Sequence, residues 1–227
     1  MPISKRLTVP WSIEKKKFKF VTTPRGAHPK KESIPLSMVI KDMLKLADTT
    51  KEAKKIIKQR KVLVDKGVCT DHKRGIGLFD LIEIPSEGKA YRLIKRKKYI
   101  LINAPEPDMK LCKIKDKKVL KKGKIQLNLH DGRNILLDKN KYSTNDSILI
   151  KLPEQKIVQD IKFEPGALAL VISGAHSGEL VKIVQIEKGL NKRLTVKPKD
   201  SNETFEVGFD HVIIVGKDTP LITLGEQ

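Results

Sequence analysis

Residues 36–84 constrain the fold of this chain most, because they join an amphipathic helical pattern to a small β-rich unit. Apolar side chains recur at steps of three and four residues from Leu36 to Ala47, which predicts a helix with one buried face. Pro35 is expected at its first position, where the missing N–H costs nothing. The stretch ends in short β-rich runs around a turn, so we predict a two-helix unit closed by strands.

A second helix is predicted to begin at Thr49, whose hydroxyl can cap the backbone while Glu52 reaches back to it. Ala53, Ile56 and Ile57 then share one side. The lysines of the opposite side are Lys51, Lys54, Lys55, Lys58 and Lys61. This arrangement indicates a binding surface for a polyanion. A solvated face that only keeps the helix soluble is the alternative.

The distribution of charge favours the polyanion. The 227 residues carry a net charge of +20, with 20 Lys and Arg against 9 acids in 85–162 but 7 against 9 in 163–227. A basic field over most of a chain favours nucleic acid, whose phosphates supply most non-specific binding. A membrane surface competes, but no apolar stretch is long enough to span a bilayer and no signal-peptide core is present. With only two cysteines, a cytoplasmic, reducing compartment is expected.

Residues 1–35 are predicted to form a basic extension without a core of its own, because five prolines interrupt any long element. The only tryptophan, Trp11, stands in this basic stretch. We expect it to dock either on the next domain of the protein or on RNA. The candidate RNA contacts of the extension are Lys5, Arg6, Trp11, Lys15, Lys16, Lys17, Arg25 and His28.

Residues 85–162 are predicted to form a basic central β domain. Strands are expected at 99–102, 125–129, 134–137 and 147–152, with Asp131-Gly132 as a hairpin turn. Lysine clusters at 95–98 and 113–124 border these strands and exceed what solubility needs. Beyond the second helix, the candidate RNA contacts are Arg60, Lys66, Lys73, Arg74, Lys95, Arg96, Lys97, Lys98, Lys121, Lys122, Lys124 and Arg133.

The last segment is predicted to be a small barrel. Its expected strands are 167–172, 181–186, 194–198, 205–207 and 212–215. The first connection carries Gly174, His176 and Gly178, with the glycines where the backbone must take φ > 0 or approach a partner closely. Because this segment is nearly neutral, we expect it to pack on protein or on the central domain more than on phosphate.

No catalytic or metal-binding constellation emerges from the sequence. A phosphate-binding loop of the G-x-x-x-x-G-K-[ST] type does not occur, and the histidines lack metal-ligand spacing. His130 and Asp131 are adjacent, so in a strand they point to opposite faces. Cys69 and His72 lack a third, orienting group. We therefore predict no enzyme, no metal, no cofactor and no small-molecule substrate.

Several short stretches occur together in the order of one known family. They include Lys5-Arg6-Leu7, Gly26-Ala27-His28, Ile34-Pro35-Leu36, Val64-Asp65, Gly77-x-x-Asp80-x-Ile82, Lys110-Leu111-Cys112-Lys113, His130-Asp131 and Val215-Gly216-Lys217. On these residues the chain resembles the S4e family of archaeal and eukaryotic small-subunit ribosomal proteins, over nearly its whole length. Five details depart from the family pattern. Pro10 and Trp11 are adjacent instead of two residues apart, and no histidine precedes Lys5-Arg6. The turn Asp65-Lys66-Gly67 has its glycine one position late, Cys69 stands where an arginine is expected, and Glu179 stands where a basic residue is common.

The resemblance implies an α+β, mostly β fold in four parts. These are a basic extension (1–35), an S4-type RNA-binding domain (36–84), a basic central β domain (85–162) and a KOW-like, SH3-type barrel with a C-terminal tail (163–227). It also implies a structural constituent of the cytoplasmic small ribosomal subunit, with small-subunit ribosomal RNA and neighbouring ribosomal proteins as partners. Two alternatives stay open: an RNA-modifying enzyme with an S4-type domain, such as a pseudouridine synthase, and a KOW-bearing transcription or translation factor.

Overall fold

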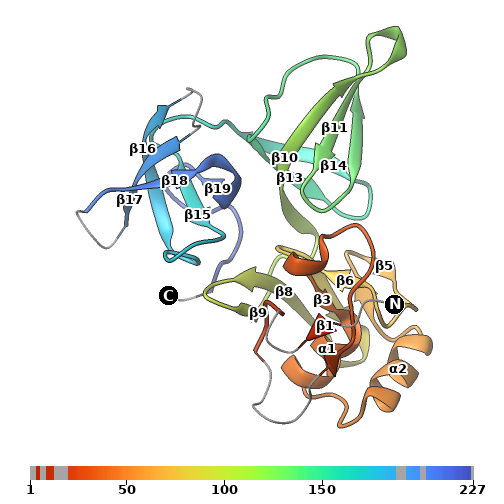
Figure 1. Cartoon of the computed structure of the whole chain (residues 1–227). Coiled ribbons are helices and arrows are strands. Elements are labelled where there is room, and N and C mark those ends of the chain that lie inside the picture. The colour runs from red at the N-terminus through yellow and green to blue at the C-terminus, as the bar shows by residue number, and fades with distance from the viewer. Residues whose placement is uncertain (1–3, 6–8, 13–19, 188–192, 200–202, 226–227) are drawn as a thin grey trace. The chain divides into compact units, whose positions relative to one another are not determined.

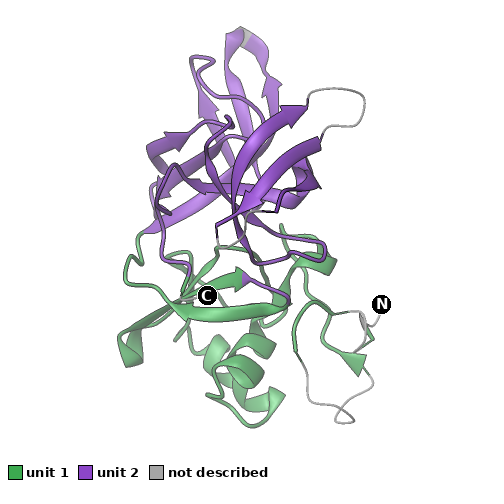
Figure 2. Cartoon of the chain, turned by 90° about the vertical axis from the view of Figure 1, so that its left-hand side faces the viewer, with its two compact units in different colours: residues 1–94, 98–108, 225–227 green, residues 95–97, 109–224 purple. Residues whose placement is uncertain are grey.

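The computed structural model describes residues 4–5, 9–12, 20–187, 193–199 and 203–225. Its elements gather into two compact units (Figure 2). The first holds Met1–Ile94, Lys98–Asp108 and Gly225–Gln227, and the second holds Lys95–Lys97 and Met109–Leu224. Strands dominate both units, and the α-helices lie in the first (Figure 1). The predicted mostly β, α+β fold is thereby confirmed.

The first predicted helix is shorter than its apolar pattern suggests. Helix α1 covers Leu36–Met38, and Val39–Met43 continue it as a π-helical turn, η3. Lys45 then takes a left-handed φ of 55°, which a right-handed helix cannot contain. Pro35 does not take the first helical position: it stands before the helix in extended geometry, in strand β3.

The second predicted helix begins as expected. Helix α2 covers Thr50–Lys58. The Glu52 N–H donates to the Thr49 hydroxyl, and the Thr49 N–H donates to the Glu52 carboxylate, both at 3.2 Å. Ala53 and Ile57 have no exposed surface, so this side of α2 faces the core of the first unit.

The main sheet of the first unit has the order β5-β4-β7-β8-β9. Its strands are β4 (Leu63–Val64), β5 (Gly67–Val68), β7 (Leu81–Ile84), β8 (Lys89–Lys95) and β9 (Tyr99–Asn103). Asp65 and Lys66 connect β4 to β5 with left-handed φ values of 51° and 66°, which suit a two-residue hairpin turn. The boundary predicted after residue 84 falls inside the β7–β8 hairpin, and the division into four domains stays a prediction.

The N-terminal segment packs onto the first unit through short pairings. Strand β1 (Ser4–Lys5) pairs with β2 (Phe20–Val21), and β3 (Ile34–Pro35) pairs with β6 (Gly75–Ile76). The Trp11 side chain is only 3% exposed. Trp11 was expected to dock either on the protein or on RNA, and the structure shows that it docks on the protein itself.

The second unit contains a central sheet of order β12-β11-β10-β13-β14. Its strands are β10 (Met109–Val119), β11 (Ile125–Leu129), β12 (Asn134–Leu137), β13 (Ser147–Lys151) and β14 (Lys156–Ile161). The sequence predicts β11, β12 and β13 but neither β10 nor β14. Strand β10 is the middle strand, and the lysine cluster expected to border the strands lies largely within it.

The C-terminal sheet of the same unit is a curled sheet of order β18-β17-β16-β15-β19 (Figure 1). Its strands are β15 (Leu168–Val171), β16 (Leu180–Glu187), β17 (Arg193–Pro198), β18 (Phe205–Gly208) and β19 (Val212–Gly216). All five lie where the sequence predicts strands. None of the helices in the described ranges is long and apolar enough to cross a membrane.

Candidate nucleic-acid interface

Helix α2 and the turn after it present six cations that we call the α2 cationic face. They are Lys51, Lys54, Lys55, Lys58, Arg60 and Lys61. Five are exposed, and Lys54 is half-buried. Within the described part of the chain, no ion pair engages any of the six. Their charge is therefore available to a bound anion.

The loop between β5 and β6 adds further cations beside α2. Burial lowers the pKa of His72, and the Lys54 ammonium lowers it further. Lys73 and Arg25 add to this effect, whereas Asp71 acts in the opposite direction. Asp71 also orders the loop, because it accepts the Lys73 N–H at 2.9 Å and lies 3.4 Å from Arg25 Nε. Lys54, Lys73 and Arg25 thus lie close enough to His72 to act on it together, and such a group of cations attracts phosphate.

Two residues predicted to contact RNA lie in the interior instead. His28 Nε2 is 2.9 Å from Asp80 Oδ2, with the two side chains 8% and 3% exposed. The His28 ring also packs so closely on Gly77 that a Cβ there would lie 2.2 Å from His28 Nδ1. Trp11 is buried as well. Neither ring offers a face to RNA, so we remove both from the interface.

Two further predicted contacts have their charge paired within the protein. Lys66 Nζ lies 3.0 Å from Glu83 and 2.7 Å from Asp108. Burial alone would lower the pKa of Lys66, but these two carboxylates raise it above its ordinary value. Arg133 Nε lies 3.3 Å from Asp131. Because both cations already pair with carboxylates of the protein, they stabilise the fold and attract a phosphate less strongly.

The other predicted contacts divide into described and undescribed positions. Those left exposed or half-buried are Lys5, Arg25, Lys73, Arg74, Lys95, Arg96, Lys97, Lys98, Lys121 and Lys124. Arg6, Lys15, Lys16 and Lys17, and the side chain of Lys122, lie outside what the structure describes. Among the described residues, no group of three or more His, Cys, Asp or Glu side chains gathers as metal ligands would.

Strand β10 holds two buried lysines whose structural role sequence reasoning missed. Lys110 Nζ lies 2.9 Å from Asp131 Oδ2, with the side chains 0% and 1% exposed. Burial alone would raise the pKa of Asp131, but Lys110 lowers it below its ordinary value. Lys113 Nζ donates to the carbonyl oxygens of Phe209 at 2.6 Å and Val212 at 2.9 Å. The available signal is the apolar setting of Leu111-Cys112 between the two lysines.

The first loop of the C-terminal sheet has the predicted backbone. Gly174 and Gly178 have φ values of 95° and 96°, which disfavour any side chain. His176 is exposed, with Nδ1 3.1 Å from the Glu179 carboxylate and its ring stacked on Phe205 at 3.9 Å between centroids. The acid Glu179 beside this loop agrees with the expectation that the segment packs on protein more than on phosphate, which stays a prediction.

Comparison with known proteins gives similarities that extend over most of the chain. Residues 35–82 match the S4 domain, and residues 88–157 match the ribosomal family S4e. The small ribosomal subunit protein eS4 of Methanocaldococcus jannaschii is 44% identical over 234 residues, covering 97% of this chain and 96% of that protein. The eS4 protein of Archaeoglobus fulgidus is 40% identical and covers 97% of each.

A solved structure agrees with these sequence similarities. The crystal structure of the 30S ribosomal protein S4e from Thermoplasma acidophilum is similar with a TM-score of 0.71 at 30% identity. The similarity covers 82% of this chain and 96% of that one. The match to the S4 domain spans helix α2 and the loop beside it, and so includes the α2 cationic face together with Lys73 and Arg74.

Proposed function

Because this chain belongs to the S4e family of ribosomal proteins, we propose that it is a structural constituent of the small ribosomal subunit and binds ribosomal RNA. The observation that carries the proposal is the α2 cationic face, which lies within the S4 domain. Each phosphate that a cation neutralises releases counterions, so such a face supplies strong, salt-dependent affinity. The role is non-catalytic and belongs to the cytoplasmic ribosome, beside other small-subunit proteins.

Further cations extend the proposed contact beyond α2. The β5–β6 loop contributes Lys73 and Arg74, and the exposed lysines that follow are Lys97, Lys98, Lys121 and Lys124. Phosphate contacts of this kind fix the position of a protein on RNA without reading the base sequence. We therefore propose many individually weak contacts over a wide surface.

The test has two parts. Gradient fractionation of cells that carry a tagged full-length chain shows whether the chain enters the small subunit, and RNA binding of the full-length chain and its variants is measured in vitro. The full-length chain is expected in the small-subunit peak and to stay there in high salt. Replacing Lys51, Lys55 and Lys58 with Glu is expected to weaken binding to small-subunit RNA. Each lost phosphate contact lowers the slope of log K against log salt by roughly 0.7 to 0.9.

A matched control changes the net charge equally at another place. Lys197, Lys199 and Lys217 are exposed lysines of the nearly neutral C-terminal segment, and replacing these three with Glu is expected to leave the slope almost unchanged. Equal slopes for the two triple variants would contradict the assignment to α2. A full-length chain that stays in the soluble fractions, with none in the subunit peak, would refute the ribosomal proposal itself.

A further inference from the structure

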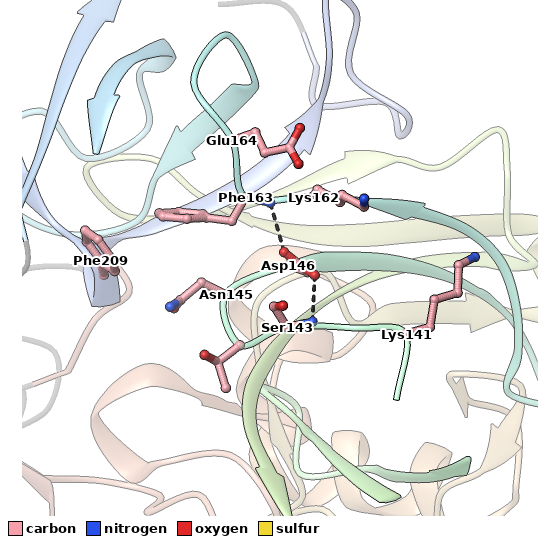
Figure 3. A pocket seen from close by; sticks show the side chains of 9 residues that line it. Lys141, Ser143, Asn145, Asp146, Lys162, Phe163, Glu164 and Phe209 are labelled. Carbon is pink, nitrogen blue, oxygen red and sulfur yellow. Dashed lines mark hydrogen bonds between the residues drawn. The ribbon is translucent and has the colours of Figure 1, made fainter. Parts of the chain in front are cut away.

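The second unit contains a pocket of about 550 Å³ that the proposed interface does not use (Figure 3). Its walls come from the segment that precedes β13, from the segment that follows β14 and from Phe209. The lining residues are Lys141, Ser143, Thr144, Asn145, Asp146, Lys162, Phe163, Glu164 and Phe209. A pocket of this size accommodates a ligand of a few tens of atoms.

The walls of the pocket are held in place by the protein's own hydrogen bonds. The buried Asp146 carboxylate accepts the Ser143 N–H at 2.8 Å and the Phe163 N–H at 2.9 Å, and so joins the two lining segments. Asn145 has a left-handed φ of 72°, and its N–H donates to the Ile114 carbonyl oxygen of β10 at 2.9 Å. The pocket is therefore ordered before any ligand arrives.

One side of the pocket combines an aromatic ring with groups that form hydrogen bonds. Phe163 is half-buried, and its ring lies 5.1 Å from that of Phe209 at an angle of 53°. Phe209 is only 8% exposed, so Phe163 offers the accessible ring. The Asn145 amide and the exposed Ser143 supply donors and acceptors beside it (Figure 3).

The rim of the pocket carries cations. Lys162 is exposed, and no ion pair within the described ranges engages it. Lys141 lies on the same side in Figure 3, with its ammonium 3.1 Å from Asp160. Two acids, Asp146 and Glu164, are among the lining residues and oppose a bound anion; Asp146 is buried and accepts two backbone N–H groups, whereas Glu164 is exposed.

We infer that this pocket binds one unstacked nucleotide of RNA. The base stacks on the Phe163 ring, Asn145 and Ser143 bond its edge, and the phosphate lies toward Lys162. Single-stranded RNA is recognised by this combination of aromatic stacking, base-edge hydrogen bonds and cations. The inference rests on the proposed function, because the bound RNA supplies the nucleotide. A peptide would use the aromatic ring and the amide but has no phosphate for the lysines.

The experiment titrates the full-length, ¹⁵N-labelled protein with AMP, GMP, CMP and UMP, and with ribose 5-phosphate as the probe without a base. The nucleotides are expected to shift the amide resonances of Asn145 and Phe163. Ribose 5-phosphate is expected to bind at least about tenfold more weakly, because base stacking is lost. Equal affinity for the two kinds of probe, or shifts confined to other surfaces, would overturn the inference.

Three variants separate the parts of the pocket. Phe163→Leu keeps the apolar volume and is expected to weaken nucleotide binding about tenfold. Asn145→Gly removes the amide but suits the left-handed backbone, so it is expected to alter the preference among the four bases with the fold intact. Glu164→Gln is expected to tighten binding by removing an opposing charge. Phe205→Leu, which removes an aromatic ring elsewhere, serves as the control and is expected to change nothing.

The two proposals fail in different ways. If the chain enters small subunits with an α2-dependent salt slope while Phe163→Leu binds nucleotides normally, the pocket inference is refuted and the proposed function stands. If nucleotides bind at Phe163 but the chain never enters the subunit, the ribosomal proposal falls, and with it the inference that ribosomal RNA supplies the nucleotide.

Discussion

Helix α2 and strand β10 carry lysine at nearly the same density, but two of the β10 lysines are buried whereas none of the α2 lysines is. Helix α2 has four lysines in nine residues, and β10 has five in eleven. The α2 lysines lie at or near the surface without ion-pair partners in the described ranges, whereas Lys110 and Lys113 of β10 are 0% and 6% exposed. Lysine frequency therefore locates an RNA-binding surface only after the burial of each side chain is known.

The difference follows from the geometry of the two elements. The helical period places the α2 lysines on the side opposite Ala53 and Ile57. Strand β10 lies in the middle of its sheet, and its residues 110–114 are buried whichever face they point to. A lysine there has no solvated side, so it needs a carboxylate or carbonyl oxygens as partners.

The largest effect is expected when the buried ion pair of β10 is broken. Lys110→Met leaves the buried Asp131 carboxylate without the ammonium 2.9 Å away, and is expected to cost about 3 kcal/mol of unfolding free energy. Urea denaturation of the full chain measures it. The double variant with Asp131→Asn removes the stranded charge and is expected to recover part of the loss. A single variant as stable as the wild type would contradict the contrast with α2.

A smaller loss is expected at the second buried lysine. Lys113→Met fills a similar volume but leaves the Phe209 and Val212 carbonyl oxygens without this donor, which is expected to cost about 2 kcal/mol. The same substitution at exposed Lys115, on the same strand, is the matched control and is expected to be nearly neutral. Equal losses at the two positions would show that burial is not the deciding factor.

The pH dependence of stability provides a separate test of Lys113. Burial lowers its pKa to about 8 in the folded protein, from 10.5. Between these values the unfolded chain binds more protons, so the unfolding free energy is expected to rise with pH from about 8 upward. The difference between the wild type and Lys113→Met, measured from about pH 7.5 to 9.5, isolates this contribution. A difference that does not change with pH would argue against a buried, protonated Lys113.

The smallest effect on stability is expected for the α2 cationic face. Replacing Lys51, Lys55 and Lys58 with Glu is expected to change the unfolding free energy by no more than about 0.5 kcal/mol per site, because the side chains are solvated and unpaired in the described structure. Thermal unfolding measures it directly. A loss comparable to that of Lys110→Met would mean that these lysines, too, serve the fold.

Local signals predicted individual elements well where the spacing of their own residues shows the pattern. The capping box of Thr49 and Glu52 and the five strands of the C-terminal sheet follow from spacing alone. Strand β10 was missed because five lysines in it masked the apolar residues that make it a middle strand. Apart from the apolar pair Leu111-Cys112 between Lys110 and Lys113, no local pattern marks lysines whose partners lie elsewhere in the chain.

The candidate site was predictable on α2 and much less so in the N-terminal segment. The helical period alone identified the face opposite Ala53. His28, in contrast, was assigned to RNA because a histidine in a basic stretch gives no sign of a partner such as Asp80, which follows 52 residues later. With His28 and Trp11 in the interior, truncation of residues 2–30 is expected to destabilise the first unit.

The order of strands in the C-terminal sheet has a consequence for how the chain folds as it is made. Strand β19 pairs with β15, the first strand of the sheet, across more than forty residues of sequence. During synthesis β15 is made before β19. The edge of Leu168–Val171 that pairs with β19 in the folded protein therefore has no partner at first. Closing so distant a pair is slow, and an open apolar edge attracts other chains in the meantime. We therefore expect this edge of β15 to stay open to other chains until Val212–Gly216 is available to pair with it.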